Sequence, residues 1–209
     1  EIAYASSYGM DYLTTYCGNQ NKYPLHNKLM KRFDYISVRE KDGIDICERE
    51  FNVKAEHVLD PVFLLDSSFY EKVANEAINK YEGPYLTSYF LKATDMYNNL
   101  LQYTANYLNL KMVNMGTGDK PQIEEQSKKT VGGCCEDLSV EEWINNIKNS
   151  EFVVTDSFHC LCFSIIFRKK FVIIQKNWGL SRIVSLLEMV GLEERRIETF
   201  EEIKQNLSY

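Results

Sequence analysis

The chain has 209 residues, of which 44% are hydrophobic and 26% charged, as in ordinary soluble proteins with one large domain or two small ones. Its formal net charge of −6 argues against a general binder of nucleic acid or anionic membranes. The apolar runs are too short to cross a bilayer, so we expect a cytoplasmic protein, free or at the inner face of the membrane.

Short strand signals alternate with helical patterns along the chain. Strands are expected at 2–6, 35–38, 57–60, 85–91, 111–115, 152–156 and 171–175. Helices are expected at 23–33, 43–51, 95–107, 139–149, 158–167, 181–190 and 200–207. This alternation, with strands that are apolar on both faces, predicts an α/β fold built on parallel sheets.

Helix 139–149 has the clearest local signals. Ser139 and Glu142 have the spacing of a capping box, in which each residue satisfies a free backbone N–H of the other. The apolar residues recur at helical spacing and are expected on one face: Val140, Trp143, Ile144 and Ile147.

Two stretches interrupt the alternation. Residues 66–84 are polar and end in Gly-Pro, which indicates a surface helix joining two α/β units. Residues 116–138 lack periodicity and predict a long loop. The expected organisation is the end of a first α/β domain, a linker and a second α/β domain, at residues 1–66, 67–84 and 85–209.

The six cysteines show neither a CxxC pair nor a Cys/His spacing that would indicate a metal site. We expect reduced thiols in a cytosolic protein, with no disulfide among Cys17, Cys47, Cys134, Cys135, Cys160 and Cys162.

The segment TDSFH places polar residues where a buried strand meets a helix. Strand 152–156 ends at Asp156, and His159 falls in the first turn of the next helix. Ligands of parallel sheets collect at the carboxyl ends of strands, and helix N-termini favour anions. His159 could therefore donate to a phosphate or act as a general acid. Alternatively, Asp156 and Ser157 cap the helix and His159 bonds to nearby backbone; the motif alone leaves both interpretations open.

A local reversal of charge favours the anion site. Residues 157–187 contain no Asp or Glu but five bases, namely Arg168, Lys169, Lys170, Lys176 and Arg182. Residues 168–170 are expected to form a solvated turn. Ser181 resembles an N-cap, and Arg182 would open the helix that follows strand 171–175.

Two charged residues follow strands in the first half of the chain. Arg39 comes after strand 35–38. It either points into the crevice at the carboxyl ends of the strands, where His159 is expected, or forms a surface ion pair with Glu40 or Asp42. Asp60 precedes a proline at a strand end, where its carboxylate could accept from loop N–H groups. His26 and His57 are expected at the surface.

Several spaced motifs together resemble the polysaccharide pyruvyl transferase family along nearly the whole chain. They are YASSYG (4–9), FDYISVRE (33–40), VLDPVFLL (58–65), YFL (89–91), VEEWINNIKNSEFVVTDSFH (140–159), FSIIF (163–167), KKFVII (169–174) and SRIVSLLEMVGLEER (181–195).

The resemblance implies a GT-B-like fold of two Rossmann-like domains. It also implies transfer of a pyruvyl group, usually as a ketal, from phosphoenolpyruvate to a sugar or lipid-linked oligosaccharide precursor of a cell-surface polysaccharide or exopolysaccharide. No cofactor and no metal are expected. The motifs imply that His159 and Arg39 are catalytic. Substrate binding is expected from Asp156, Ser157, Ser181, Arg182 and Asp60.

The chain departs from the family pattern in two places. Cysteines occupy positions 160 and 162, where small residues commonly follow the motif histidine. Family members also carry a long portion before YASSYG, so this chain alone is expected to be inactive. Two other functions stay open: a GT-B glycosyltransferase that uses a nucleotide sugar, and a non-catalytic domain that binds an anion or acts as a scaffold.

Overall fold

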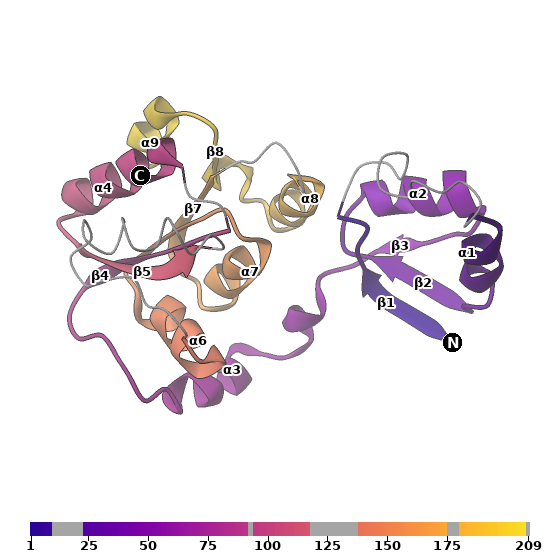
Figure 1. The fold of residues 1–209 in the computed structure, drawn as a ribbon, viewed down its shortest axis with the longest axis horizontal. Coiled ribbons are helices and arrows are strands. Elements are labelled where there is room, and N and C mark those ends of the chain that lie inside the picture. Colours follow the sequence, from indigo (N-terminus) through magenta and orange to yellow (C-terminus); the bar gives the residue numbers. More distant parts are fainter. Residues whose placement is uncertain (10–22, 92–93, 118–137, 175–179, 208–209) are drawn as a thin grey trace. The chain divides into compact units, whose positions relative to one another are not determined.

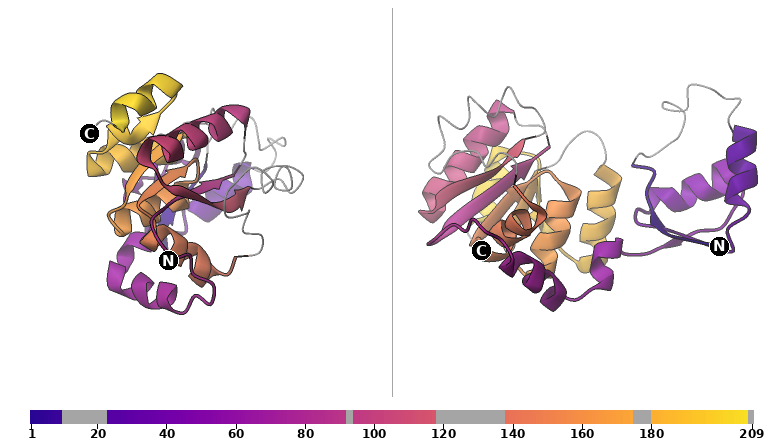
Figure 2. Two further views of the ribbon diagram at one scale, coloured as in Figure 1. Left: turned by 90° about the vertical axis from the view of Figure 1, so that its left-hand side faces the viewer. Right: turned by 60° about the horizontal axis from the view of Figure 1, so that its bottom comes forward.

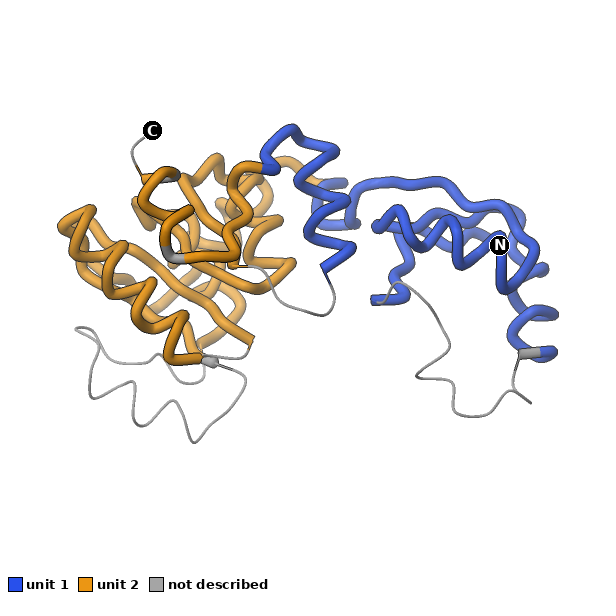
Figure 3. The backbone as a smooth tube through the Cα atoms, turned by 90° about the horizontal axis from the view of Figure 1, so that it is seen from above, with its two compact units in different colours: residues 1–64, 176–193 blue, residues 65–175, 194–209 orange. Residues whose placement is uncertain are grey.

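A computed structural model describes residues 1–9, 23–91, 94–117, 138–174 and 180–207 (Figure 1). The chain divides into two compact units (Figure 3). The first unit comprises residues 1–64 and 176–193, and the second comprises residues 65–175 and 194–209.

The first unit contains a three-stranded parallel sheet in the order β1-β2-β3. The strands are β1 (Ile2–Ser6), β2 (Tyr35–Val38) and β3 (Glu56–His57). The helices of this unit are α1 (Tyr23–Met30), α2 (Asp42–Phe51), the short 3-10 helix η2 (Pro61–Leu64) and α8 (Leu180–Val190).

Helix α2 packs on one face of this sheet. Ile36 and Val38 alternate toward it and form a core with Cys47. The start of α2 lies so close to β2 that a Cβ at Gly43 would approach the Cβ of Val38 to 2.9 Å. Glycine is therefore required at position 43, and the turn that joins β2 to α2 is fixed in place.

The second unit contains a five-stranded parallel sheet in the order β5-β4-β6-β7-β8. Its strands are β4 (Tyr85–Phe90), β5 (Lys111–Thr117), β6 (Phe152–Thr155), β7 (Lys170–Ile174) and β8 (Arg196–Ile197). Its helices are α3 (Ser67–Asn75), α4 (Asp95–Leu108), α6 (Val140–Asn149), α7 (Phe158–Ile166) and α9 (Phe200–Asn206), and the 3-10 helix η3 (Glu193–Arg195) precedes β8.

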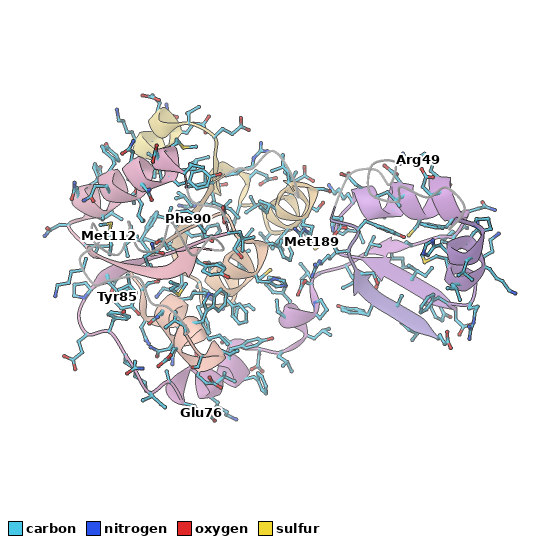
Figure 4. All side chains as sticks on the ribbon, in the orientation of Figure 1. Arg49, Glu76, Tyr85, Phe90, Met112 and Met189 are labelled. Carbon is cyan, nitrogen blue, oxygen red and sulfur yellow. The ribbon has the colours of Figure 1, made fainter. Side chains whose placement is uncertain are left out.

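Helices cover both faces of this second sheet. Helices α4 and α9 lie on one face, and α3, α6 and α7 lie on the other (Figure 2). Phe90 and Met112 face the α4 side and join the core there (Figure 4). Tyr85 faces the other side, where its hydroxyl donates to the backbone oxygen of Asn146 at 3.1 Å. Because both faces are covered, most residues of these strands are apolar, and the polar residues Thr87, Ser88 and Asn114 are buried with them.

The predicted α/β class with parallel sheets is confirmed. The structure contains all the expected strands, and each expected helix begins within one residue of its predicted start. Strand β3 was expected at 57–60 but covers only 56–57. Strand β8 was not predicted, because two residues give too little pattern to recognise.

The capping box of α6 is also confirmed, with Ser139 Oγ accepting from the N–H of Glu142 and the Glu142 carboxylate accepting from the N–H of Ser139. Val140 begins the helix at the spacing expected for its apolar face, but this side chain is 66% exposed. Val140 is the first residue after the cap, so it lies at the end of the apolar stripe.

The segment expected as a linker contacts the second unit. Helix α3 packs against α6 and α7: Lys148 donates to Asn75 Oδ1 at 3.1 Å, and the rings of Tyr70 and Phe163 meet edge to face. Residues 176–193, which were expected in the second domain, are grouped with the first unit. The expected long loop lies mostly outside the described residues, apart from Leu138 and from Gly116 and Thr117, which extend β5.

Candidate functional site

Asp156 lies at the carboxyl edge of the second sheet, directly after β6. Its side chain is nearly fully buried, and its Oδ1 accepts from the N–H of Leu91, the residue after β4, at 2.7 Å. Thr155 reinforces this junction by donating to the backbone oxygen of Tyr89 at 2.5 Å. Asp156 therefore joins the ends of two neighbouring strands.

Ser157 occupies the N-cap position of α7, but its side chain makes no capping hydrogen bond. It is buried, and its N–H donates to Thr155 Oγ1 at 3.0 Å. The capping alternative is therefore wrong for the Ser157 side chain. Asp156 holds the end of β4, a role that the sequence did not suggest.

His159 lies in the first turn of α7 and is exposed, whereas its neighbours Phe158 and Cys160 are buried. Its ring meets that of Phe158 edge to face, with centroids 5.4 Å apart. An imidazole in this position is open to solvent at the N-terminal end of the helix. It can therefore exchange protons with a ligand or with water.

The cysteines that follow His159 belong to the core. Burial raises the pKa of the Cys160 thiol to about 12, although the contact with Thr155 opposes this shift. Cys162 is equally buried. A thiol with so high a pKa is protonated near neutral pH and is neither a nucleophile nor a metal ligand there.

Arg39 and Asp60 meet at the carboxyl edge of the first sheet. Arg39 follows β2, and its Nη1 forms an ion pair with Asp60 Oδ2. The side chains are 18% and 2% exposed. Asp60 Oδ1 also accepts from the N–H of Val62 in η2 at 3.1 Å, as expected for a carboxylate at a strand end.

This pairing corrects the alternative interpretation of Arg39. A surface ion pair with Glu40 or Asp42 was considered, but the guanidinium pairs with a buried carboxylate 21 residues away. A charged pair removed from water interacts more strongly than a surface pair, provided that its remaining polar atoms are satisfied. The structure thus brings together two residues that the sequence proposed separately.

Glu40 was missed as a candidate because it was interpreted only as an ion-pair partner. Its side chain is fully buried, and Oε1 accepts from three groups of the segment that follows β1. The donors are Ser7 Oγ at 3.0 Å, Tyr8 N–H at 2.6 Å and Gly9 N–H at 3.2 Å. The only sequence signal was its place beside Arg39, between a buried strand and a helix.

The prediction that Ser181 is an N-cap was wrong, because α8 already includes Leu180. Ser181 is a first-turn residue, and both it and Arg182 are half-buried. Within the first unit, α8 contacts the start of α2, where the N–H of Lys41 donates to Ser185 Oγ at 3.0 Å. These two candidates therefore belong to a helix of the first unit.

The predicted solvated turn at 168–170 is only partly correct. Arg168 is exposed and adopts a left-handed conformation with φ of 52°. Lys169 is half-buried and donates to the backbone oxygen of Lys148 at 3.0 Å, and its burial lowers the pKa of its ammonium group. Lys170 begins β7, and Lys176 lies outside the described residues.

The model of the polysaccharide pyruvyl transferase family matches residues 2–175. The chain is a member of this family. A search of curated proteins gave no match. The matched region includes five of the candidates and stops before the other two, Ser181 and Arg182.

Other features of this pyruvyl transferase family member bear on its chemistry. No group of His, Cys, Asp or Glu suited to a metal occurs among the residues that the structure describes. Cys47, Cys160 and Cys162 are not in disulfides, and the remaining three cysteines lie outside the described ranges. In those ranges, no helix combines the length and the apolar character that a membrane span needs.

Proposed function

We propose that the protein transfers the pyruvyl group of phosphoenolpyruvate to two hydroxyl groups of one sugar, forming a ketal. The family match carries this proposal, because it spans both the strand end with Arg39 and the helix start with His159. The acceptor would be a sugar or lipid-linked oligosaccharide precursor of a cell-surface polysaccharide or exopolysaccharide. We include in the proposal a GT-B-like class for the fold and a cytoplasmic location, where phosphoenolpyruvate is made.

The chemistry sets clear demands. Two sugar oxygens form bonds to C2 of the donor, C3 gains a proton and becomes a methyl group, and the C2–O bond to phosphate breaks. The two hydroxyl groups lose two protons in total: one balances the proton gained by C3 and the other leaves with phosphate. The reaction therefore needs a group that moves protons and cations that neutralise the donor.

His159 suits the proton-transfer role. Its imidazole is exposed at the first turn of α7, and histidine is the side chain that enzymes use most often as a general acid or base. In this proposal it delivers the proton to C3 directly or through water. Asp156 and Ser157 bind substrate beside it, and the buried bond from Leu91 N–H to Asp156 keeps that strand end fixed.

Arg39 suits the binding of an anionic donor. A guanidinium can bind a phosphate or carboxylate through two parallel hydrogen bonds. Its ion pair with Asp60 fixes its direction, and Asp60 also binds η2. Ser181 and Arg182 of α8 remain further proposed contacts for the donor. No cofactor and no metal enter this scheme.

Ligand binding to the complete gene product tests the proposal and separates it from the alternatives. Phosphoenolpyruvate should raise the midpoint of thermal unfolding, and nucleotide sugars such as UDP-glucose should not. The reverse pattern would indicate a glycosyltransferase, and a response to neither would indicate a non-catalytic domain. Mass spectrometry of a saccharide incubated with phosphoenolpyruvate and the protein, together with phosphate release, then tests ketal transfer.

A further inference from the structure

Among the described residues, the buried carboxylate of Glu40 accepts hydrogen bonds from one short segment of the first unit, at residues 7–9. All three of its hydrogen bonds from this segment end on Oε1. Its other oxygen, Oε2, is equally buried and has no hydrogen-bond partner in the described structure. An isolated carboxylate is costly to bury, so a position that needed only packing would be better filled by an apolar side chain.

The segment that Glu40 holds is bonded directly to Arg39. The N–H of Arg39 donates to the backbone oxygen of Ser6 at 3.2 Å. The side chain of Tyr8 anchors the same segment on α2: its hydroxyl lies 3.3 Å from Cys47 Sγ, and its ring stacks on Phe51. The backbone of Arg39 is therefore fixed from the side of β1, and Asp60 holds its guanidinium from the side of β3.

The backbone of Glu40 has little freedom to adjust. Its carbonyl oxygen accepts from the N–H of Gly43 at 3.0 Å, and Gly43 packs directly on Val38. Loss of the Glu40 carboxylate should therefore release residues 6–9 and leave the start of α2 in place. The released segment would no longer hold the main chain of Arg39 in one position.

We propose that Glu40 is a positioning residue for the phosphoenolpyruvate site and acts through the Ser6–Gly9 segment on Arg39. This inference rests on the proposed function. A guanidinium binds an anion through two parallel hydrogen bonds only when its plane faces the anion in the right direction. Misplacement by about 1 Å can lower the reaction rate by up to about 10²-fold. The carboxylate at position 40 thus keeps Arg39 in the direction that the donor requires.

A double-mutant cycle on phosphoenolpyruvate affinity tests this proposal in the complete gene product. Glu40→Ala should raise the Kd for phosphoenolpyruvate by roughly 10-fold or more. Glu40→Gln keeps an acceptor oxygen in the same place, so it should lose some stability but stay within about 3-fold of the wild-type Kd. In an Arg39→Ala background, Glu40→Ala should change the Kd by less than about 2-fold, because its effect passes through Arg39.

Ile46→Val is the matched control for stability. Ile46 is fully buried in α2 and does not contact the donor in this proposal, so its truncation should lower the melting temperature without changing the Kd. Ser7→Ala removes one of the three donors and leaves the carboxylate in place, so it should raise the Kd by about 2- to 3-fold. If Glu40→Ala does not fold, the Kd of Ser7→Ala tests the proposal in its place.

Three results would overturn the inference while leaving the proposed function intact. They are a wild-type Kd in folded Glu40→Ala, an unchanged Kd in Ser7→Ala, and an equal loss from Glu40→Ala with and without Arg39. A wild-type protein that does not bind phosphoenolpyruvate would instead contradict the proposed function itself, and this inference with it.

Discussion

At the scale of single residues, the candidates differ in how firmly they are held. His159 is exposed beside buried neighbours, whereas Arg39 and Glu40 are tied into the first sheet by Asp60 and by residues 6–9. An exposed side chain can be changed without cost to the core, whereas a buried charge cannot. Substitution of His159 therefore tests the chemistry alone, whereas substitution of Arg39 or Glu40 also affects stability.

His159→Ala should leave the melting temperature within about 2 °C of wild type, because exposed substitutions usually change stability by less than about 0.5 kcal/mol. Pyruvyl transfer should fall by roughly 10² to 10⁴, the usual effect of losing a general acid or base. A coupled phosphate-release assay on the complete gene product measures the change. His26→Ala, at an exposed position of α1, is the matched control and should retain full activity.

Near-wild-type transfer by His159→Ala would remove its catalytic role. If the variant still binds phosphoenolpyruvate but no longer turns over, proton transfer is the step affected. If binding is lost as well, His159 contributes mainly to holding the donor.

At the scale of elements, the ends of the helices carry local signals that can be tested separately from function. Helix α7 ends in a left-handed turn, with Arg168 N–H donating to Ile165 O at 2.9 Å and Lys169 N–H to Ser164 O at 2.8 Å. Helix α6 begins with a capping box, and its glutamate, Glu142, also accepts a hydrogen bond from the N–H of Asn79. Arg168 is exposed, whereas Glu142 is a buried polar residue, so the two ends are tested in different ways.

Arg168→Gly should stabilise the protein by about 0.5–1 kcal/mol, because glycine adopts positive φ without the strain caused by a Cβ. Thermal unfolding should show a midpoint higher by a few degrees. Arg168→Ala removes the same charge but keeps a Cβ, so it should give no such increase. Equal stabilisation by both variants would show that loss of the arginine charge is responsible, and not the backbone.

Glu142 should make stability depend on acid pH. Its pKa is lowered first by the N–H of Ser139 and then by the backbone and side-chain N–H groups of Asn79, which stabilise the charged form. A carboxyl whose pKa is lower in the folded state makes its full contribution to the stability of the fold at pH values above its unfolded pKa, near 4.5. This contribution is lost as the pH falls through the folded pKa.

Urea unfolding of wild type and Glu142→Gln between pH 3 and pH 7 measures this contribution. The difference between the two proteins should be greatest at neutral pH and shrink below about pH 4.5. Glu141→Gln is the neighbouring comparison: the pKa of Glu141 is also lowered, by its own backbone N–H and by Ser139, but the hydrogen bonds to Asn79 belong to Glu142, so the difference between the two variants reports on Asn79. A difference that stays constant with pH would show that the charge of Glu142 is unimportant.

At the scale of the whole molecule, the chain does not divide into units at one point. Residues 176–193, which include α8, are grouped with the first unit, although the strands before and after them, β7 and β8, belong to the second. Within the first unit, α8 accepts a hydrogen bond at Ser185 Oγ from the N–H of Lys41. A fragment that ends at residue 64 therefore lacks part of its own unit.

Hydrogen exchange tests this division of the chain. In the whole chain, the amide of Lys41 should be protected, because its acceptor Ser185 is buried. In a fragment of residues 1–64, and in Ser185→Ala, this amide should exchange at least about 10-fold faster. The amide of Val58, which donates to Val38 O, is the internal reference and should keep its protection in Ser185→Ala. Unchanged exchange of Lys41 in that variant would contradict the contact.

Local patterns in the sequence were enough to predict the α/β class, the strands 85–91, 111–115, 152–156 and 171–175, and the cap of α6. The first-turn position of His159 followed from the same patterns. These features depend on neighbours within a few residues, where periodicity and capping act. The family resemblance, now shown by the match over 2–175, came from motif order alone.

Only the tertiary structure decided which charged residues meet. Arg39 pairs with Asp60 because β2 and β3 are neighbours in a parallel sheet, and Glu40 binds residues 7–9 because β1 lies on the other side of β2. These partners are 21 and 31 to 33 residues apart in the chain. The sequence suggests the strands, but the order of strands in the sheet sets these pairings, and it depends on packing across the whole unit.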